Sequence, residues 1–371
     1  MGTLLSRLIW VAAGALSVLI AAELVLRALP VSMGLYRTDQ YDRWPLQSSE
    51  SRLAYTYSSS WALRNAHRGV TNNYGHIAPF DFRKGGKPVI VIGDSYVESL
   101  MNDYADTLQA QLADKLGRRD SVYGLGVSGL SASDYLVLSS QARDEFAPVA
   151  AVFVITDGDI AESLLPSPGS RFIVLDAARP RLDYLPLRGE SLAKRIRKVA
   201  GESSLYRYLQ VNLRFSPADI LGMFRPASAA LQGVGTPPMG EELDRQRRVA
   251  DFFLGELPTA LALAPECIVL LMDSDRHAIY KPAAATPRKD DPSTRLYVIE
   301  RARALGIKVS DLDPVFRDRY ARDRMKFDHW PNDRHWNRLG HAIAATEAYR
   351  LLSEPDAQGR AACLAGPGAA R

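Results

Sequence analysis

Short apolar runs alternate with amphipathic stretches through most of the chain. The runs read PVIVIGD, SVYGLGVSG, AAVFVIT, ECIVLLMD and GIKVSDL, at 88–94, 121–129, 150–156, 266–273 and 306–312. Helical stretches, TLQAQLADKLG and SDYLVLSSQARDEF, separate the first three runs. Apolar strands that alternate with helices are typical of a mainly parallel sheet covered on both faces. The pattern therefore predicts an α/β fold, whose ligands bind beyond the carboxyl ends of the strands.

The N-terminus carries the longest apolar run. Residues 8–26 read LIWVAAGALSVLIAAELVL, interrupted only by Ser17 and Glu23. At 1.5 Å per residue this run is about as long as a bilayer is thick. Cleaved signal peptides have apolar regions of about 7 to 15 residues and a small-residue cleavage site. The longer run, without a convincing site of that kind, predicts an uncleaved membrane anchor over residues 1–29. Arg7 favours an N-terminus inside, whereas arginines after the run favour the opposite orientation.

The rest of the chain divides by composition. Residues 30–85 show no sustained helical or strand period, which predicts a connecting arm between the anchor and the main domain. The main domain is expected over 86–352. Within it, residues 163–240 are rich in Pro and Arg, interrupt the alternation and predict an insertion. Residues 353–371 are rich in Gly and Ala and predict a flexible tail.

Composition and charge exclude several classes of protein. The chain has 371 residues, 47% hydrophobic and 24% charged, which is ordinary for a globular protein. Its net charge of +4 comes from 46 basic and 42 acidic residues that are well mixed, so nucleic acid is not an expected partner. Cys267 and Cys363 stand in no zinc-ligand spacing, and no metal or other cofactor is predicted. Whether the two cysteines form a disulfide stays open, and CIVLLMD favours a core position for Cys267.

A candidate nucleophile follows the first predicted strand. The strand PVIVI would deliver Gly93, Asp94 and Ser95 to the carboxyl edge of the sheet, where a helix begins. Glycine permits a sharp turn, and the free N–H groups of a helix N-terminus favour developing negative charge. A three-residue match also arises by chance, and Asp-Ser is a common helix cap.

A serine nucleophile needs a base, which is normally a histidine oriented by a carboxylate. The stretch PNDRHWNRLGHAIAATEAYRLL places Asp333 two residues before His335, ahead of a predicted helix. One loop can therefore supply both the base and its acid. Three other histidines are alternatives: His329 with Asp328, His277 with Asp275, and His341, for which a structural role is favoured. His67 and His76 lie in the predicted arm without a nearby carboxylate.

The order IGDSY, YGLGVSG, VITDGDI and DRHWNRLGH resembles the four signature blocks of the SGNH/GDSL hydrolase superfamily, in its membrane-anchored bacterial branch. The resemblance extends from about residue 70 to 352. It implies a flavodoxin-like three-layer α/β/α sandwich with a mainly parallel sheet, preceded by one transmembrane helix. It also implies that Ser95 is the nucleophile, that His335 is the general base and that Asp333 orients the base.

In this superfamily the oxyanion hole uses the nucleophile's backbone N–H, here Ser95, the N–H of the last glycine of the second block, here Gly129, and an asparagine side chain. This chain has Gly158 in place of that asparagine. Losing one such donor typically costs about 10²- to 10³-fold in turnover. Three interpretations stay open: Thr156, Asp157 or the Gly158 backbone substitutes, the enzyme is slow, or the protein has become a binding module.

The implied function is a serine-dependent ester hydrolase or acyltransferase that acts through an acyl-enzyme. Its substrate would be an ester, foremost the O-acyl and in particular O-acetyl groups of cell-surface glycan. The implied location is the bacterial cytoplasmic membrane, with a single pass and the catalytic domain on the periplasmic side. Alternatives are a catalytically silent glycan-binding or scaffold protein of a polysaccharide export system, and a lipid esterase. The stretch SSLYRYLQVNLRF is either a wall of a glycan groove or an ordinary amphipathic helix.

Overall fold

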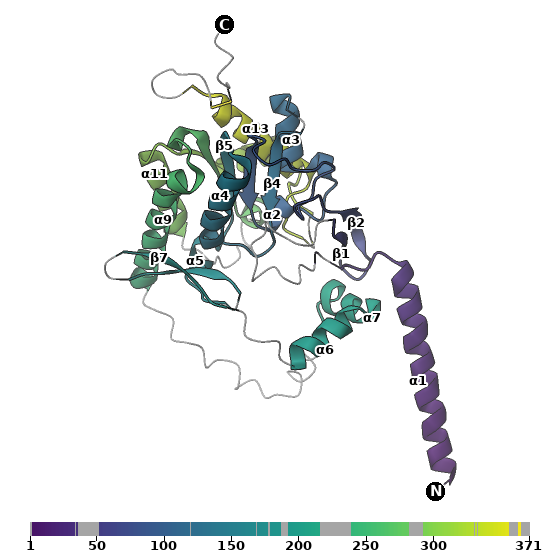
Figure 1. Ribbon diagram of the computed structural model, residues 1–371. Helices are drawn as coiled ribbons and strands as arrows, with labels where there is room; N and C mark the ends of the chain where they lie inside the picture. The colour runs from purple at the N-terminus through teal and green to yellow at the C-terminus, as the bar shows by residue number, and fades with distance from the viewer. Residues whose placement is uncertain are drawn as a thin grey trace. The chain divides into compact units, whose positions relative to one another are not determined.

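The computed structural model describes residues 2–33, 35, 52–118, 120–167, 169–176, 179–186, 192–215, 239–281, 292–329, 331, 333–355 and 363–364 (Figure 1). They form two compact units. Unit 1 consists of the described residues of Met1–Tyr36, Ala54–Gly69 and Arg188–Val234. Unit 2 consists of those of Arg37–Leu53, Val70–Leu187 and Gly235–Arg371.

Unit 2 is built on one parallel sheet. Its five strands are β3 (Val89–Gly93), β4 (Val122–Gly126), β5 (Ala150–Ile155), β8 (Ile268–Met272) and β9 (Lys308–Asp311). They lie in the order β4-β3-β5-β8-β9, and every neighbouring pair is parallel. Val91 of β3 is thus paired with Gly124 on one side and with Val152 on the other. In doubly wound sheets, ligands bind where the strand order reverses, which here is between β3 and β5.

Helices cover both faces of this sheet, because its strands are apolar on both faces. Ile90, Phe153 and Leu270 belong to the core under α4 (Ala132–Phe146), α9 (Met239–Leu261) and α11 (Pro292–Ala304). Val91, Val152 and Leu271 belong to the core under α3 (Leu108–Leu116), α12 (Leu312–Asp323) and α13 (Arg338–Ser353). Figure 1 shows the two helical layers on opposite sides of the strands. The α/β class with a mainly parallel sheet is therefore confirmed.

Shorter elements complete unit 2. They are α2 (Ser95–Glu98), η2 (Tyr104–Asp106), α5 (Asp159–Glu162), η5 (Pro265–Cys267), α10 (Arg276–Tyr280) and an antiparallel hairpin of β6 (Arg171–Val174) and β7 (Arg181–Tyr184). A disulfide joins Cys267 to Cys363, with Cα atoms 5.5 Å apart. Cys267 is half-buried in this bond rather than a free core residue. The open question of cysteine pairing is thereby answered.

Unit 1 combines helices with a small sheet. Its elements are α1 (Gly2–Ala28), the two-stranded sheet of β1 (Ala54–Ser59) and β2 (Arg64–Val70), α6 (Leu192–Gly201), α7 (Ser204–Arg207) and a π-helical turn, η3 (Tyr208–Asn212). Asn212 connects these parts, because its Oδ1 accepts from the Ser32 N–H at 3.1 Å and its Nδ2 donates to the Ser58 carbonyl at 3.1 Å.

The long apolar helix is confirmed as α1. Its segment Leu4–Ala28 is long and apolar enough to cross a membrane, and none of it is buried in the protein. Disulfides form in oxidising compartments, and an N-terminal apolar helix serves as a signal or an anchor. Together these two features indicate a location outside the cytoplasm.

The predicted arm and insertion are more structured than their sequences indicated. Residues 54–70 of the arm form two strands, although no strand period was detected there. Residues 70–85 belong to unit 2, where Phe82 stacks on Tyr123 with ring centroids 4.1 Å apart. The insertion contains β6, β7, α6 and α7. Residues 36–51, 216–238, 356–362 and 365–371, which belong to the predicted arm, insertion and tail, lie outside the described residues.

Candidate active site

Ser95 lies at the carboxyl end of β3, at the start of α2. Asp94 caps this helix, because its Oδ1 accepts a hydrogen bond from the Tyr96 N–H at 2.9 Å. The helix packs tightly on β4: a Cβ atom on Gly126 would lie 2.0 Å from the backbone nitrogen of Glu98. Glycine is therefore required at that position. The turn leaves the Ser95 side chain half-buried at the point where the strand order reverses.

Ser95, His335 and Asp333 form a continuous chain of hydrogen bonds. His335 Nε2 lies 2.8 Å from Ser95 Oγ, and His335 Nδ1 lies 2.5 Å from Asp333 Oδ1. The same carboxylate oxygen accepts from the backbone N–H of His335 at 2.9 Å, which fixes the two residues within one turn. With Nδ1–H donated to Asp333, Nε2 is free to accept the proton of the Ser95 hydroxyl. The structure thus brings together the three residues that the sequence nominated.

Two carboxylates set the protonation of this histidine. Burial alone would lower the pKa of His335, but the hydrogen bond and the charge of Asp333, with a further contribution from Asp94, raise it above its ordinary value. Asp94 is itself perturbed: burial raises its pKa to about 6, against the lowering effects of the Tyr96 N–H and of His335. At pH 8, above this value, Asp94 is charged.

A buried arginine fixes the backbone immediately before His335. Arg276 Nη2 donates to the Arg334 carbonyl at 2.6 Å and to the Tyr96 hydroxyl at 2.8 Å, and that hydroxyl donates to the same carbonyl at 3.0 Å. Arg276 Nη1 pairs with Asp273, the residue after β8, and Asp273 also accepts from Trp336 Nε1 at 3.0 Å. The residues on both sides of His335 are therefore bound to groups at the end of the sheet.

This arginine balances two buried carboxylates. Besides Asp273, its Nε lies 3.5 Å from Asp328 Oδ2, and all three side chains are buried. Burial raises the pKa of Asp328 to about 6, although the charge of Arg276 acts in the opposite direction. The cluster carries one cation for two carboxylates, and the charge of Arg276 also acts on the neighbouring site, where it lowers the pKa of His335.

The backbone N–H groups of Ser95 and Gly129 have no acceptor among the described residues. Gly129 has a φ of 84° and is exposed. The loop before it is fixed to α2, because the N–H of Ser128 donates to the buried Glu98 carboxylate at 3.2 Å and the Ser128 hydroxyl donates to the same oxygen. An oxyanion hole requires N–H donors that are unpaired in this way.

The third block supplies no open side-chain donor. Gly158 caps α5 with a φ of 106° and is buried. The Thr156 hydroxyl lies 3.1 Å from Asp159 Oδ1 and 3.4 Å from Asp94 Oδ2, so its single proton is directed to a carboxylate. To serve as a substitute donor it would have to give up these bonds. Asp157 is exposed, and an ionised carboxylate only accepts hydrogen bonds.

His341 has a structural environment. It is fully buried, and its Nδ1 accepts from the Leu108 N–H at 3.1 Å. Nε2 must then carry the proton, and it lies 3.1 Å from Ser99 Oγ. Burial lowers the pKa of His341 to about 3, so the ring is neutral. It fixes α13 to the start of α3.

The rival bases lie elsewhere. His329 Nε2 is 3.1 Å from Asn102 Oδ1, and its predicted partner Asp328 pairs instead with Arg276. Asp275 caps α10 by accepting from the Ala278 N–H at 3.2 Å, which engages the predicted acid of His277 in a helix cap. In both of these Asp-His pairs the carboxylate therefore interacts with a group other than the histidine.

Sequence reasoning missed Arg276 and Asp273. In the sequence, the stretch DSDRH stands out only for its Asp-x-His spacing. An available signal was the position of these charges directly after the apolar run CIVLLM, which puts them at the carboxyl edge of the sheet. Within the described residues, no three His, Cys, Asp or Glu side chains form a group that could hold a metal ion.

No protein-family model and no curated protein matches this chain. Among solved structures, the chain is similar to the crystal structure of LAE5, an alpha/beta hydrolase enzyme from the metagenome of Lake Arreo, Spain. The two are 15% identical, the match covers 73% of this chain and 96% of that one, and the TM-score is 0.36. A likeness this distant carries no argument about the site, so the case for function depends on the geometry described above.

Proposed function

We propose that the protein is a serine-dependent ester hydrolase or acyltransferase of the SGNH/GDSL type. The observation that carries the proposal is the chain of hydrogen bonds from Ser95 Oγ through His335 to Asp333 at the carboxyl edge of the sheet. The strand order further supports it. When the five strands are numbered in chain order, their order across the sheet is 2-1-3-4-5, which is the flavodoxin-like order.

The reaction begins with proton transfer from Ser95 Oγ to His335 Nε2. Ser95 Oγ attacks the ester carbonyl carbon, and the N–H groups of Ser95 and Gly129 stabilise the resulting oxyanion. His335 then donates its proton to the leaving alcohol as the carbon–oxygen bond breaks, which leaves an acyl-enzyme. Water or an acceptor hydroxyl then attacks the acyl carbon while His335 removes its proton. His335 returns this proton to Ser95 Oγ as the bond between Oγ and the acyl carbon breaks, which releases the acid or the new ester. Asp333 holds the ring in the required tautomer throughout.

The proposed substrates are O-acyl groups, foremost O-acetyl groups, of cell-surface glycan. Three features support this assignment: an apolar helix α1 long enough to span a membrane, a location outside the cytoplasm, and a site whose polar groups suit an ester without a cofactor. The proposed location is the cytoplasmic membrane of a bacterium, with unit 2 on the outer side.

Retention of α1 is supported by its bonds to the rest of unit 1. Glu23 accepts hydrogen bonds from Ser203 Oγ at 2.8 Å and from the backbone N–H of Leu205 at 2.8 Å. A cleaved signal would lose both. Full-length protein should therefore remain in the membrane fraction after an alkaline wash and begin at its own N-terminus, whereas recovery of a form that starts near Ser32 would contradict the anchor.

The proposed activity is tested in one incubation, in which the covalent state of the protein and the acetylation of the glycan are both measured. A fluorophosphonate probe should label Ser95 covalently, and the Ser95→Ala variant should stay unlabelled. With an acetyl donor the protein should hydrolyse slowly alone and acetylate an oligosaccharide when one is supplied, both measured by mass spectrometry. Hydrolysis without transfer across a panel of glycans would leave an esterase. Absence of labelling in folded protein would overturn the enzyme and favour a silent glycan-binding protein.

A further inference from the structure

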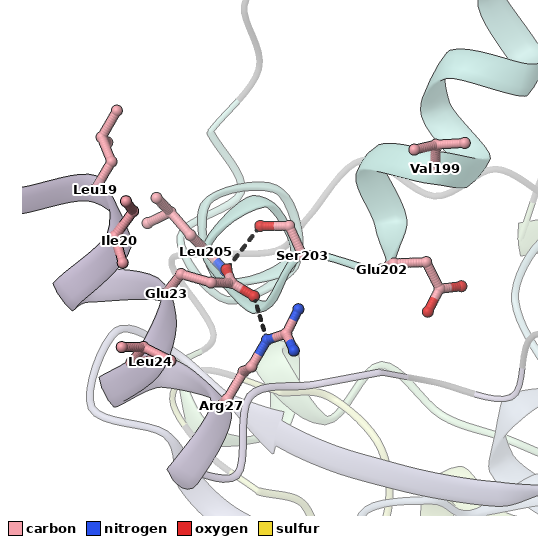
Figure 2. A pocket seen from close by; sticks show the side chains of 9 residues that line it. All are labelled: Leu19, Ile20, Glu23, Leu24, Arg27, Val199, Glu202, Ser203 and Leu205. Atoms are coloured by element: carbon pink, nitrogen blue, oxygen red, sulfur yellow. Dashed lines mark hydrogen bonds and ion pairs between the residues drawn. The ribbon is translucent and has the colours of Figure 1, made fainter. Parts of the chain in front are cut away.

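Unit 1 contains a hollow of about 570 Å³ between α1 and the segment formed by α6 and α7, here called the α6–α7 segment (Figure 2). Its lining is mostly apolar. Figure 2 shows side chains of α1 facing this segment, with Val199 of α6 across from them. The lining residues are Leu19, Ile20, Glu23, Leu24, Arg27, Val199, Glu202, Ser203 and Leu205.

Glu23 fixes the α6–α7 segment to α1. Its carboxylate accepts from Ser203 Oγ at 2.8 Å, from the Ser204 N–H at 3.0 Å and from the Leu205 N–H at 2.8 Å. The Arg27 Nε also donates to it, at 2.7 Å. An acid inside an apolar helix is thus satisfied by the first turn of α7 and by one arginine (Figure 2). The level of Glu23 on α1 is therefore also the level of the start of α7.

If α1 spans a bilayer, that level is the edge of the membrane. Between Arg7 and Glu23, α1 carries no charged residue, and this stretch is about 24 Å long at 1.5 Å per residue. The hydrocarbon layer of a bilayer is about 30 Å thick, so a spanning α1 must hold both charges at the boundaries of that layer. Arg7 can extend to the headgroups, whereas the shorter Glu23 needs its protein partners.

The described side chains of α6 are suited to the same boundary between the hydrocarbon layer and the headgroups. Ile196 and Val199, three residues apart, are 59% and 74% exposed, which is unusual for β-branched apolar residues facing water. Arg195 and Lys198, also three residues apart and exposed, form a neighbouring basic stripe. An apolar stripe beside a basic one is typical of a helix that lies in the membrane interface and meets anionic headgroups.

We propose that the hollow binds a phospholipid of the surrounding bilayer, with its acyl chain against Leu19, Leu24 and Val199 and its anionic headgroup near Arg27, Arg195 and Lys198. The α6–α7 segment is then a second membrane contact beside the anchor. Of the acids at the hollow, Glu23 is paired with Arg27 and with the start of α7, and Glu202 projects away from α1 in Figure 2. The proposal rests on α1 being a retained anchor.

Nitroxide labels at three exposed apolar positions test the depth of the segment. Full-length protein carrying Leu16→Cys, Val199→Cys or Leu296→Cys is labelled and placed in phosphatidylcholine–phosphatidylglycerol liposomes, and collision rates with oxygen and with a water-soluble nickel complex are compared. These side chains are 58%, 74% and 58% exposed, so they differ in location rather than in protein burial. Leu16 reports the anchor, and Leu296, on α11, reports an aqueous surface.

We expect Val199, like Leu16, to be accessible to oxygen and protected from nickel, and Leu296 to show the reverse. A lipid-accessible Leu16 with an aqueous Val199 would overturn the proposal and leave the anchor intact, whereas an aqueous Leu16 would overturn the anchor itself. Replacing Glu23 with Ala should make Val199 more accessible to nickel without changing Leu16.

The headgroup is tested with spin-labelled lipids. The wild-type protein should retain phosphatidylglycerol over phosphatidylcholine, and the double variant Arg195→Gln/Lys198→Gln should lose that preference, by about fivefold for each charge at most. Equal retention of the two lipids by the wild-type protein would contradict an anionic headgroup at this position.

Discussion

Replacing Arg276 with Met is expected to lower both the stability of the fold and the reactivity of the site. The change removes donors at 2.6 Å and 2.8 Å from the Arg334 carbonyl and the Tyr96 hydroxyl, and it leaves Asp273 and Asp328 without their cation. Removing one partner of a buried ion pair typically costs about 3–5 kcal/mol of stability. Domains have about 5–15 kcal/mol, so the variant should remain folded at low temperature.

The loss of stability should depend on pH in a defined direction. Burial already raises the pKa of Asp328 to about 6, and without Arg276 that pKa rises further. A carboxyl whose pKa is higher in the folded than in the unfolded state favours folding at low pH, and the benefit is lost as pH rises through the folded value. The destabilisation measured by urea unfolding should therefore be smaller at pH 5 than at pH 8.

The catalytic effect has two readouts. Freed from Arg276, the turn that carries His335 can shift, and a displacement of about 1 Å costs on the order of 10²-fold in rate. The second-order rate of fluorophosphonate labelling at Ser95 should fall by about that factor. The charge of Arg276 also lowers the pKa of His335, so its removal should move the acid limb of the pH–rate profile to higher pH.

Arg295→Met is the matched control. Arg295 is also a largely buried arginine at the end of β8, where it donates to the Asp311 carboxylate at 2.6 Å and to the Asp273 carbonyl at 3.0 Å. In the described structure it makes no bond to the turn around His335. The Arg295→Met variant should lower the stability of the fold without shifting the acid limb of the pH–rate profile. If folded Arg276→Met protein were labelled at the wild-type rate, with the same pH profile, the positioning role would be refuted.

Three further outcomes are expected. Ser95→Ala and His335→Ala should each remove nearly all esterase activity. The double variant should have little less activity than either single variant, because the two residues act as one unit. His277→Ala should leave esterase activity unchanged. The rate of acylation should rise with pH through a value above the ordinary histidine pKa, and Asp333→Asn should move this limb to lower pH, because the hydrogen bond of Asp333 is the main cause that raises the pKa. Gly158→Asn should increase turnover of an activated acetyl ester, because it restores a hydrogen-bond donor. It should also lower the melting temperature, because the φ of 106° suits glycine. Unchanged turnover in folded protein would contradict the missing-donor explanation.

Much of this arrangement is local and could therefore be predicted. The five apolar runs became the five strands. Four of these strands are buried at every position, and β9 is buried at its two central positions, so their sequences are apolar on both faces. The position of Ser95 follows from the end of one such run. Asp333 and His335 are two residues apart, so their contact needs one turn and no knowledge of the fold.

The rest depends on distant contacts that no local pattern carries. Arg276 meets Tyr96 across 180 residues, and Glu23 meets Ser203 across another 180. The strands β1 and β2 are not predicted from the sequence. In β2, exposed positions alternate with half-buried ones, so this strand lacks the apolar face that marks a strand in sequence. The pairing of Cys267 with Cys363 likewise spans 96 residues.

The exposure of the site bears on the choice between hydrolysis and transfer. The His335 side chain is 27% exposed whereas Asp333 is 8% exposed, so solvent reaches the base but hardly reaches its acid. Water can then be activated at Nε2 in any acyl-enzyme. An acceptor hydroxyl prevails only when binding holds it against the acyl carbon, which supplies an effective molarity of up to about 10⁵–10⁸ M. Transfer therefore requires a bound acceptor, and a membrane anchor that keeps the enzyme beside a surface polymer would supply that acceptor at high local concentration.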